Sequence, residues 1–275
     1  MKPPQITVSH LFPELLSELL HILSELSPEE WQKPTGCPGW SVKDVAAHLL
    51  GVEAGILSGE RDEFGEAWIV TDSWDELVAL LNQHNEAWVL ATRRISPALL
   101  CDLLKSLGEQ TCRYYASVNP EATGPVVDWA GPEPAPMWLH LAREYTERWH
   151  HQQQIREALG QTLLTQPHFF APVLATFVFG MPRAYSDITA PVGTTVELSI
   201  LGDSGGEWHL VRGEDSWRLS TVDTAATAAQ LMIDQYDAWK LFTRSVPKSQ
   251  VVPRVQVRGD TELALRALET VSVIA

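Results

Sequence analysis

Apolar residues recur at helical spacing along the chain up to about residue 183. From Ile6 to Leu26 they follow one another at intervals of three and four, which predicts a first helix. Ser41 stands directly before the next apolar stretch, and Asp44 follows three residues later. This capping-box pattern predicts a helix from Val42 to about residue 57. The same periodicity predicts helices over residues 74–95, 97–118, 137–159 and 167–179. Together these segments predict an antiparallel helical bundle in residues 1–183.

The pattern changes near residue 190, where apolar and polar residues begin to alternate. Alternation over residues 195–200, and shorter apolar runs that follow turn residues, predict strands. The further predicted strands are 208–211, 216–219 and 251–257, and the further predicted helices are 225–233, 237–243 and 261–273. The expected fold class is therefore α+β, with a small α+β domain in residues 191–275 after the helical bundle.

Residues 119–136 separate two of the predicted helices and contain five prolines and two glycines. Proline removes a backbone donor and glycine favours turns, so this composition argues against regular structure. The length of the segment is that of a functional loop.

The charge balance limits the classes of partner. The chain has 35 acidic and 20 basic residues, a net charge of -15, which repels phosphate backbones and anionic lipid heads. We therefore expect no nucleic-acid partner. No basic segment with an apolar stretch opens the chain, and no apolar run approaches the ~20 residues of a membrane span. We expect a cytoplasmic protein with no membrane partner, whose three cysteines are reduced thiols, and the oligomeric state stays open.

Two imidazoles and two carboxylates share one face of the helix predicted over residues 137–159. On a helical wheel, His140, Glu144, Glu147 and His151 form one stripe, which apolar residues continue toward the end of the helix. Buried there, these groups need compensation, which a metal ion provides when a ligand from a second helix joins them. His48 is the best candidate, because it lies beside the apolar stripe of its own predicted helix.

Spacing alone leaves two interpretations of this stripe open. Either the four residues bind a metal, or a buried histidine is simply paired with a glutamate, which is a common structural feature and needs no metal.

Two tryptophans and one cysteine are further candidates for the site. Tryptophans are usually core residues, but Trp40 and Trp149 stand close to the proposed ligands and are candidates to line a cofactor pocket. Cys37 precedes a helix N-terminus, where a thiolate is favoured, but no nearby base is evident and a structural role is favoured.

Residues 37–49, with the sequence CPGWSVKDVAAHL, resemble the signature of the mycothiol-dependent maleylpyruvate isomerase family. Glu147, His151 and the Ala-Leu-Gly ending at residues 158–160 resemble the family's second signature. Residues 241–244 and 257–260 look like its closing elements, so the likeness covers nearly the whole chain. It implies a DinB-like metal-binding bundle in which His48, Glu147 and His151 hold zinc or another divalent metal. The chain departs from the family at Gln154, where an aspartate is usual.

The resemblance implies an enzyme that acts on a small molecule. Three protein ligands leave one position of a tetrahedral zinc open, and zinc acidifies a bound thiol. Mycothiol or a related low-molecular-weight thiol would then attack a small electrophilic substrate as its thiolate. Arg244 is the candidate catalytic residue, because its guanidinium could bind a carboxylate of the substrate. The alternative, that Arg244 is a surface arginine without a role in the reaction, is equally compatible with the sequence.

Other functions remain open on the same three ligands. A thiol S-transferase or a metal-dependent hydrolase would use them without returning an isomerised product. In a non-enzymatic binding module the metal would be structural, and a fourth protein ligand would complete its coordination. His140 and Glu144 are the candidates for that ligand.

Overall fold

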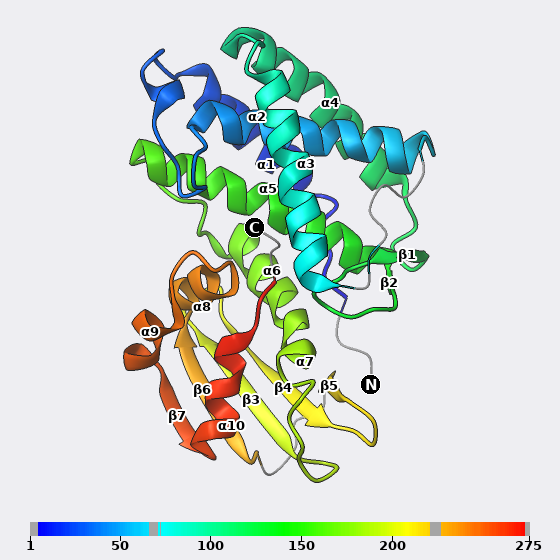
Figure 1. Cartoon of the computed structure of the whole chain (residues 1–275), viewed down its shortest axis with the longest axis vertical. Helices are drawn as coiled ribbons and strands as arrows, with labels where there is room; N and C mark the ends of the chain where they lie inside the picture. Colours follow the sequence, from blue (N-terminus) through cyan, green and yellow to red (C-terminus); the bar gives the residue numbers. More distant parts are fainter. Residues whose placement is uncertain (1–4, 66–70, 72, 221–226, 273–275) are drawn as a thin grey trace. The chain divides into compact units, whose positions relative to one another are not determined.

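The computed structural model describes residues 5–65, 71, 73–220 and 227–272 (Figure 1). The chain forms two compact units. The helical unit comprises residues 8–119 and 145–164, and the sheet unit comprises residues 1–7, 120–144 and 165–275. The chain crosses between the units at four places, and one of these boundaries, between residues 144 and 145, falls within the helix α5 (Met137–Leu159).

The helical unit is built from α-helices whose starts match the capping signals of the sequence. The Ser41 side chain accepts from the Asp44 N–H, and the Asp44 side chain accepts from the Ser41 N–H, so the predicted capping box is present. Ser73 and Ser96 cap the next two helices through the side chain alone, which accepts from the N–H of Glu76 and of Leu99. The elements are α1 (Phe12–Ser24), η1 (Glu30–Gln32), α2 (Val42–Ile56), the π-helical turn η2 (Leu57–Arg61), α3 (Trp74–Thr92), α4 (Pro97–Ser117) and the second part of α5.

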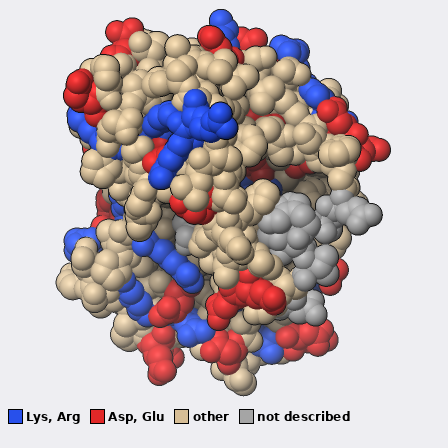
Figure 2. Space-filling view, turned by 45° about the horizontal axis from the view of Figure 1, so that its top comes forward, with Lys and Arg blue, Asp and Glu red and all other residues tan. Residues whose placement is uncertain are grey.

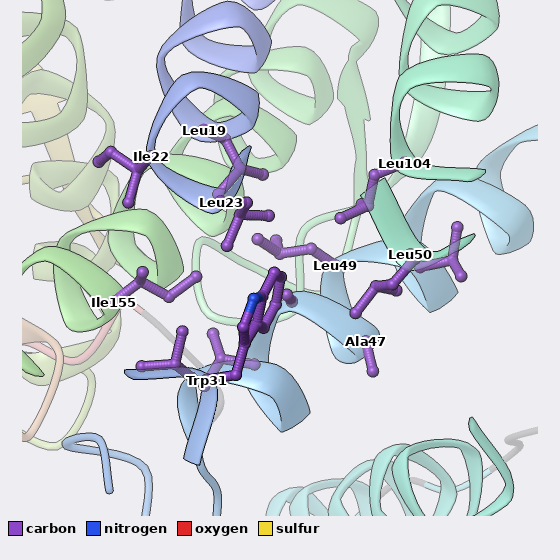
Figure 3. Packing of buried hydrophobic residues seen from close by; sticks show 13 residues of the cluster. Leu19, Ile22, Leu23, Trp31, Ala47, Leu49, Leu50, Leu104 and Ile155 are labelled. Atoms are coloured by element: carbon purple, nitrogen blue, oxygen red, sulfur yellow. The ribbon is translucent and has the colours of Figure 1, made fainter. Parts of the chain in front are cut away.

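The core of this unit lies where α1, α2 and α4 meet. Figure 3 shows Trp31 of η1 pointing toward Leu23 of α1 and Leu49 of α2, with Leu104 of α4 and Ile155 of α5 at the sides. Each fully buried aliphatic side chain contributes about 1.5–3 kcal/mol. Because Leu49 follows His48 directly in α2, this core fixes the segment of α2 that carries the histidine.

α5 is buried although most of its second half is polar. Its Arg148 side chain donates two hydrogen bonds to Glu53 of α2, at 2.8 and 3.1 Å. Arg156 donates to Glu18 of α1 and to the carbonyl of Thr162, both at 2.7 Å. Arg148 and Glu53 are both buried, and removing one partner of such a pair costs about 3–5 kcal/mol, because a charge is left uncompensated. Glu18 is 40% exposed, so its pair with Arg156 contributes less. These pairs therefore fix α5 against both α1 and α2.

The sheet unit contains a five-stranded sheet in the order β5-β4-β3-β6-β7. β3 (Thr195–Leu201) pairs in parallel with β6 (Ala229–Asp234), and the other neighbours are antiparallel. α8 and α10 contact strands of the sheet (Figure 1). The remaining elements are β1 (Thr123–Val126), β2 (Pro134–Pro136), α6 (Pro167–Phe177), η3 (Val178–Gly180), α7 (Met181–Ala184), β4 (Gly206–Arg212), β5 (Trp217–Ser220), α8 (Gln235–Phe242), α9 (Lys248–Val251), η4 (Val252–Arg254), β7 (Gln256–Gly259), α10 (Thr261–Leu265) and η5 (Arg266–Glu269).

The predicted fold class is confirmed: a helical bundle is joined to a small α+β part. The division into domains at residues 183–191 stays a prediction, because compactness does not test which segments fold alone. Among the residues that the structure describes, every helix is too short or too polar to span a bilayer.

Several predicted elements are wrong in detail. The helix predicted over residues 225–233 is a strand from Ala229 onward, since pairing with β3 outweighs the helix propensity of alanine, while residues 225–226 lie outside the described residues. The strand predicted over residues 251–257 begins only at Gln256, after a 3₁₀ turn that contains Pro253. The irregular segment 119–136 contains the β1–β2 pair. The closing helix is regular only to Leu265.

On the face that Figure 2 shows, acidic and basic groups are interspersed and most of the surface is uncharged. The expectation that nucleic acid is not a partner stays a prediction.

We predict opposite effects on stability for two glycines of α2. A Cβ at Gly51 would lie 2.7 Å from Nε1 of Trp88, which donates to the Ala47 carbonyl at 2.8 Å. Gly51→Ala should push the indole away, and overpacking of this kind costs about 1–3 kcal/mol. At Gly55 nothing lies within 4 Å of an added Cβ, so Gly55→Ala should raise stability by up to about 1 kcal/mol. Urea unfolding of both variants measures the difference. Equal gains in both would show that Trp88 does not hold α2.

Candidate metal centre

α2 brings one imidazole into the interior of the helical unit. His48 is only 5% exposed, one turn after the capping box and between buried neighbours of the same helix. Trp88 of α3 donates to the carbonyl of Ala47, the residue before it. The backbone that carries His48 is therefore held from two sides, by the core and by α3.

α5 brings a carboxylate and a second imidazole to His48. Glu147 and His151 are one helical turn apart, a spacing that places both side chains on the same face. Oε1 of Glu147 lies 3.0 Å from Nε2 of His48 and 3.1 Å from Nε2 of His151. The two imidazole rings are 4.6 Å apart between centroids, at 69°. Two ring nitrogens thus face one carboxylate oxygen.

This donor set fits a divalent metal ion. The ligand atoms of the three residues all lie within 4.8 Å of one another. In a tetrahedral site with bonds of about 2.0–2.2 Å, neighbouring ligand atoms are about 3.3–3.5 Å apart. The observed separations of 3.0 and 3.1 Å are close to that edge length. Two imidazoles and one carboxylate are also a ligand set that catalytic zinc sites use. The structure thus brings together the three residues that the sequence singled out.

The electrostatics of the three groups are those of a partly buried ion pair, Glu147 with His151, beside a neutral His48. Burial lowers the pKa of His48, because it disfavours the charged ring. Burial opposes ionisation of Glu147 as well, but the charge of His151 and hydrogen bonds from both histidines hold its pKa well below the ordinary value. At His151, burial is outweighed by the charge of Glu147 and by contacts with Cys37 and Glu147, which raise its pKa well above the ordinary value.

A second layer of side chains surrounds His151. Nδ1 of His151 lies 2.7 Å from Oε1 of Gln154, and the Cys37 thiol donates to the same oxygen at 3.0 Å. Nε2 of Gln154 lies 3.1 Å from Nε2 of His150, which is buried. No pattern in the sequence indicates the contact of Cys37 with Gln154. The spacing of three residues between His151 and Gln154 was the signal that could have revealed their hydrogen bond.

The two tryptophans named as pocket candidates have different positions. The ring of Trp40 lies 5.2 Å from that of His48, and its Nε1 donates to Glu86 of α3 at 2.7 Å. Trp40 also borders an open hollow of about 620 Å³, together with Lys43 and Arg93. Trp149 is fully buried and donates to the Leu164 carbonyl at 2.9 Å, so this placement gives no support to a contact with a cofactor.

The other candidate residues lie outside the group of three. Arg244 is in the sheet unit, exposed at the end of α8 with a left-handed backbone (φ 54°), and its catalytic role stays a prediction. Arg143 contacts both His140, at 3.3 Å, and Glu144. These two residues are not part of the ligand group found among the described residues. The three cysteines are free thiols, and burial raises the pKa of Cys112 to about 11.

Comparison with known proteins finds a matching family model, two proteins of similar sequence and two solved structures of similar fold. The model of the mycothiol maleylpyruvate isomerase N-terminal domain matches residues 12–156. Two uncharacterized proteins of Mycobacterium tuberculosis, from strains CDC 1551 / Oshkosh and ATCC 25618 / H37Rv, are each 28% identical over 140 residues. The match covers 50% of this chain and 51% of theirs, so the chain spans about half the length of the curated relatives it matches.

Two solved structures share the fold. A crystal structure of the mycothiol-dependent maleylpyruvate isomerase has a TM-score of 0.54 and 12% identity, covering 86% of this chain and 88% of that one. A histidine-to-alanine mutant of the mycothiol-dependent maleylpyruvate isomerase has a TM-score of 0.51 and 13% identity, covering 92% of each chain. At such low identity the likeness concerns the arrangement of helices and strands.

We predict that Glu147→Gln reverses the pH dependence of stability in the metal-free protein. The pKa of His151 is raised in the folded state, so its pairing stabilises fully below pH ~6.5 and is lost as pH rises through the folded pKa. The wild type should therefore lose stability above pH 7, by at most about 1.4 kcal/mol per pH unit. In Glu147→Gln the charge of Glu147 is gone, and burial, the largest influence, outweighs the remaining contact with Cys37 and lowers that pKa, so the contribution of His151 should increase with pH instead.

Urea unfolding with a chelator, from pH 6 to pH 9, measures both slopes. Glu157→Gln, an exposed position on the same helix, is the control and should keep the slope of the wild type. Identical slopes in the wild type and Glu147→Gln would contradict the ion pair.

Proposed function

The chain belongs to the family defined by the mycothiol maleylpyruvate isomerase N-terminal domain, and we propose that it is a metal- and thiol-dependent enzyme of this type. In this proposal His48, Glu147 and His151 hold zinc or another divalent metal, and mycothiol or a related low-molecular-weight thiol attacks a small electrophilic substrate. One observation carries the proposal: two buried imidazoles place a nitrogen 3.0 and 3.1 Å from one oxygen of the partly exposed Glu147 carboxylate, inside the region that the family model matches.

The residues of the chain supply the donors and the charge that such a site requires. His48 and His151 present their Nε2 atoms, and Glu147 contributes one negative charge that partly balances a divalent cation. Bound there, zinc would act as a Lewis acid that lowers the pKa of a thiol in its open position. The low exposure of both histidines, 5% and 6%, limits water around the group and strengthens its electrostatic interactions.

The isomerase reaction requires no net change in the thiol. Bound at the open metal position, the thiol would supply a nucleophilic sulfur that adds reversibly to the cis double bond of the substrate, lets that bond rotate, and leaves again as the trans isomer is released. We assign Arg244 the role of binding a substrate carboxylate, since its guanidinium is exposed and carries two parallel donors.

Other chemistries on the same ligands make different products. A thiol S-transferase would leave the sulfur on the substrate, and a hydrolase would add water. A binding module with a structural metal needs a fourth protein ligand. The ligand group found among the described residues has three members, which favours an enzyme.

We predict that the protein binds one zinc ion per chain and that each of the three ligands is required. His48→Ala, Glu147→Ala and His151→Ala should each weaken zinc binding by at least about 100-fold, because a site with two protein ligands is incomplete. Glu144→Ala is the matched control on α5 and should retain most of the metal. Elemental analysis and competition with a chromophoric chelator measure this. Loss of metal in Glu144→Ala with retention in Glu147→Ala would identify a different ligand pair.

We predict that the thiol binds the metal-loaded protein as its thiolate and releases a proton. Its apparent affinity should then rise with pH toward the pKa of the free thiol. Calorimetry with mycothiol in buffers of different ionisation enthalpy measures the proton, and S-methylated mycothiol is the control that cannot ionise. Absence of proton release would favour a hydrolytic or structural site.

The same preparation tests the reaction. With mycothiol and maleylpyruvate, product analysis should show the trans isomer and unconsumed thiol. Arg244→Ala should raise KM with metal binding unchanged. A product that retains sulfur would establish the S-transferase instead.

A further inference from the structure

We propose that Gln154 is a positioning residue that fixes the tautomer of His151 and so keeps its Nε2 atom available to a metal. This inference rests on the proposed metal site and assigns a role to a residue outside the ligand group. Gln154 is only 7% exposed, and its Oε1 lies 2.7 Å from Nδ1 of His151. The short distance and the burial make this a hydrogen bond that water does not replace.

The direction of this hydrogen bond follows from the chemistry of its two atoms. An amide oxygen can only accept, so Nδ1 of His151 must carry the proton. In the charged ring Nε2 carries a proton as well, and a metal would displace that proton; the remaining proton then stays on Nδ1 and the lone pair is on Nε2. Nε2 is the atom that faces Glu147 at 3.1 Å. The amide of Gln154 therefore selects the tautomer in which the inward-facing nitrogen can bind a metal.

Two further contacts hold the Gln154 amide in this orientation. The thiol of Cys37 donates to Oε1 at 3.0 Å, and Nε2 of Gln154 lies 3.1 Å from a ring nitrogen of His150. If the amide turned over, its NH₂ group would face Nδ1 of His151. The neutral ring would then keep its one proton on Nε2, the proposed ligand atom, because Nδ1 would have to accept from the amide. Cys37, in the turn before α2, thus helps to align a residue on α5.

A glutamine achieves this alignment without adding a charge. Glu147 is the one acidic member of the ligand group, so two imidazoles and one carboxylate carry a single negative charge. A carboxylate at position 154 would accept the same hydrogen bond but place a second negative charge behind His151. The expected effect of Gln154→Glu is therefore an intact tautomer with equal or tighter metal binding, whereas Gln154→Leu removes the acceptor at similar volume.

The test compares Gln154→Leu and Gln154→Glu with Gln153→Leu. Gln153 is the matched control, because it is a buried glutamine on the same helix that bonds the Trp149 carbonyl and the Leu164 N–H instead. Zinc affinity is measured by chelator competition. The exchange of the His151 Nδ1 proton is measured by ¹⁵N NMR, in zinc-loaded and metal-free protein.

Gln154→Leu should weaken zinc binding about 10–100-fold and speed exchange of the Nδ1 proton. Gln154→Glu should restore both, and Gln153→Leu should lower stability with both unchanged. Zinc affinity within twofold of the wild type and unchanged exchange in Gln154→Leu would overturn the inference. If the wild type binds no zinc, the proposed function fails separately. In that case the exchange of the His151 Nδ1 proton in the metal-free protein decides whether Gln154 is a positioning residue. Faster exchange in Gln154→Leu than in the wild type supports this role, and equal exchange in both refutes it.

Discussion

The need to compensate buried polar groups on α5 determines how the helical unit is built. Arg156 pairs with Glu18 of α1, and Arg148 pairs with Glu53 of α2. Because an unpaired buried charge costs several kcal/mol, these contacts fix the positions of α1 and α2 along α5. His48 then meets Glu147 and His151 as a consequence of the same alignment. The candidate metal centre is thus one of several polar pairings along α5, and the one in which three metal-ligating atoms converge.

The parts of this arrangement that depend on local periodicity could be predicted from the sequence. The capping box at Ser41 and the full extent of α5 follow from residue spacing, and both are present. The i, i+4 spacing of Glu147 and His151, with an apolar continuation of the stripe, also placed both side chains inward. Predicting that His48 is a ligand required one further inference. The apolar residues beside it in the helix indicated that its side chain points into the interior.

The parts that depend on contacts between distant segments could not be predicted. Cys37 and Gln154 are 117 positions apart, and no pattern in either segment indicates that they meet. The strand β6 exists because it pairs with β3, although the alanine-rich sequence of residues 225–229, at whose end it begins, favours a helix. Trp149 shares its helix with the proposed ligands, but a helical wheel cannot distinguish a pocket from the core when a helix is buried on nearly all sides. At Arg244, the left-handed backbone has no signal in the residue type.

The family match covers residues 12–156 and so includes all three proposed ligands, whereas Arg244 lies outside it. Metal binding is therefore the claim on which the rest of the functional account depends. Anomalous diffraction from crystals of the zinc-loaded protein, recorded on both sides of the zinc absorption edge, tests it most directly. The account predicts one peak about 2.0–2.2 Å from Nε2 of His48, an oxygen of Glu147 and Nε2 of His151, with no fourth protein ligand. A peak held by other residues, a fourth protein ligand, or no peak at this position would contradict it.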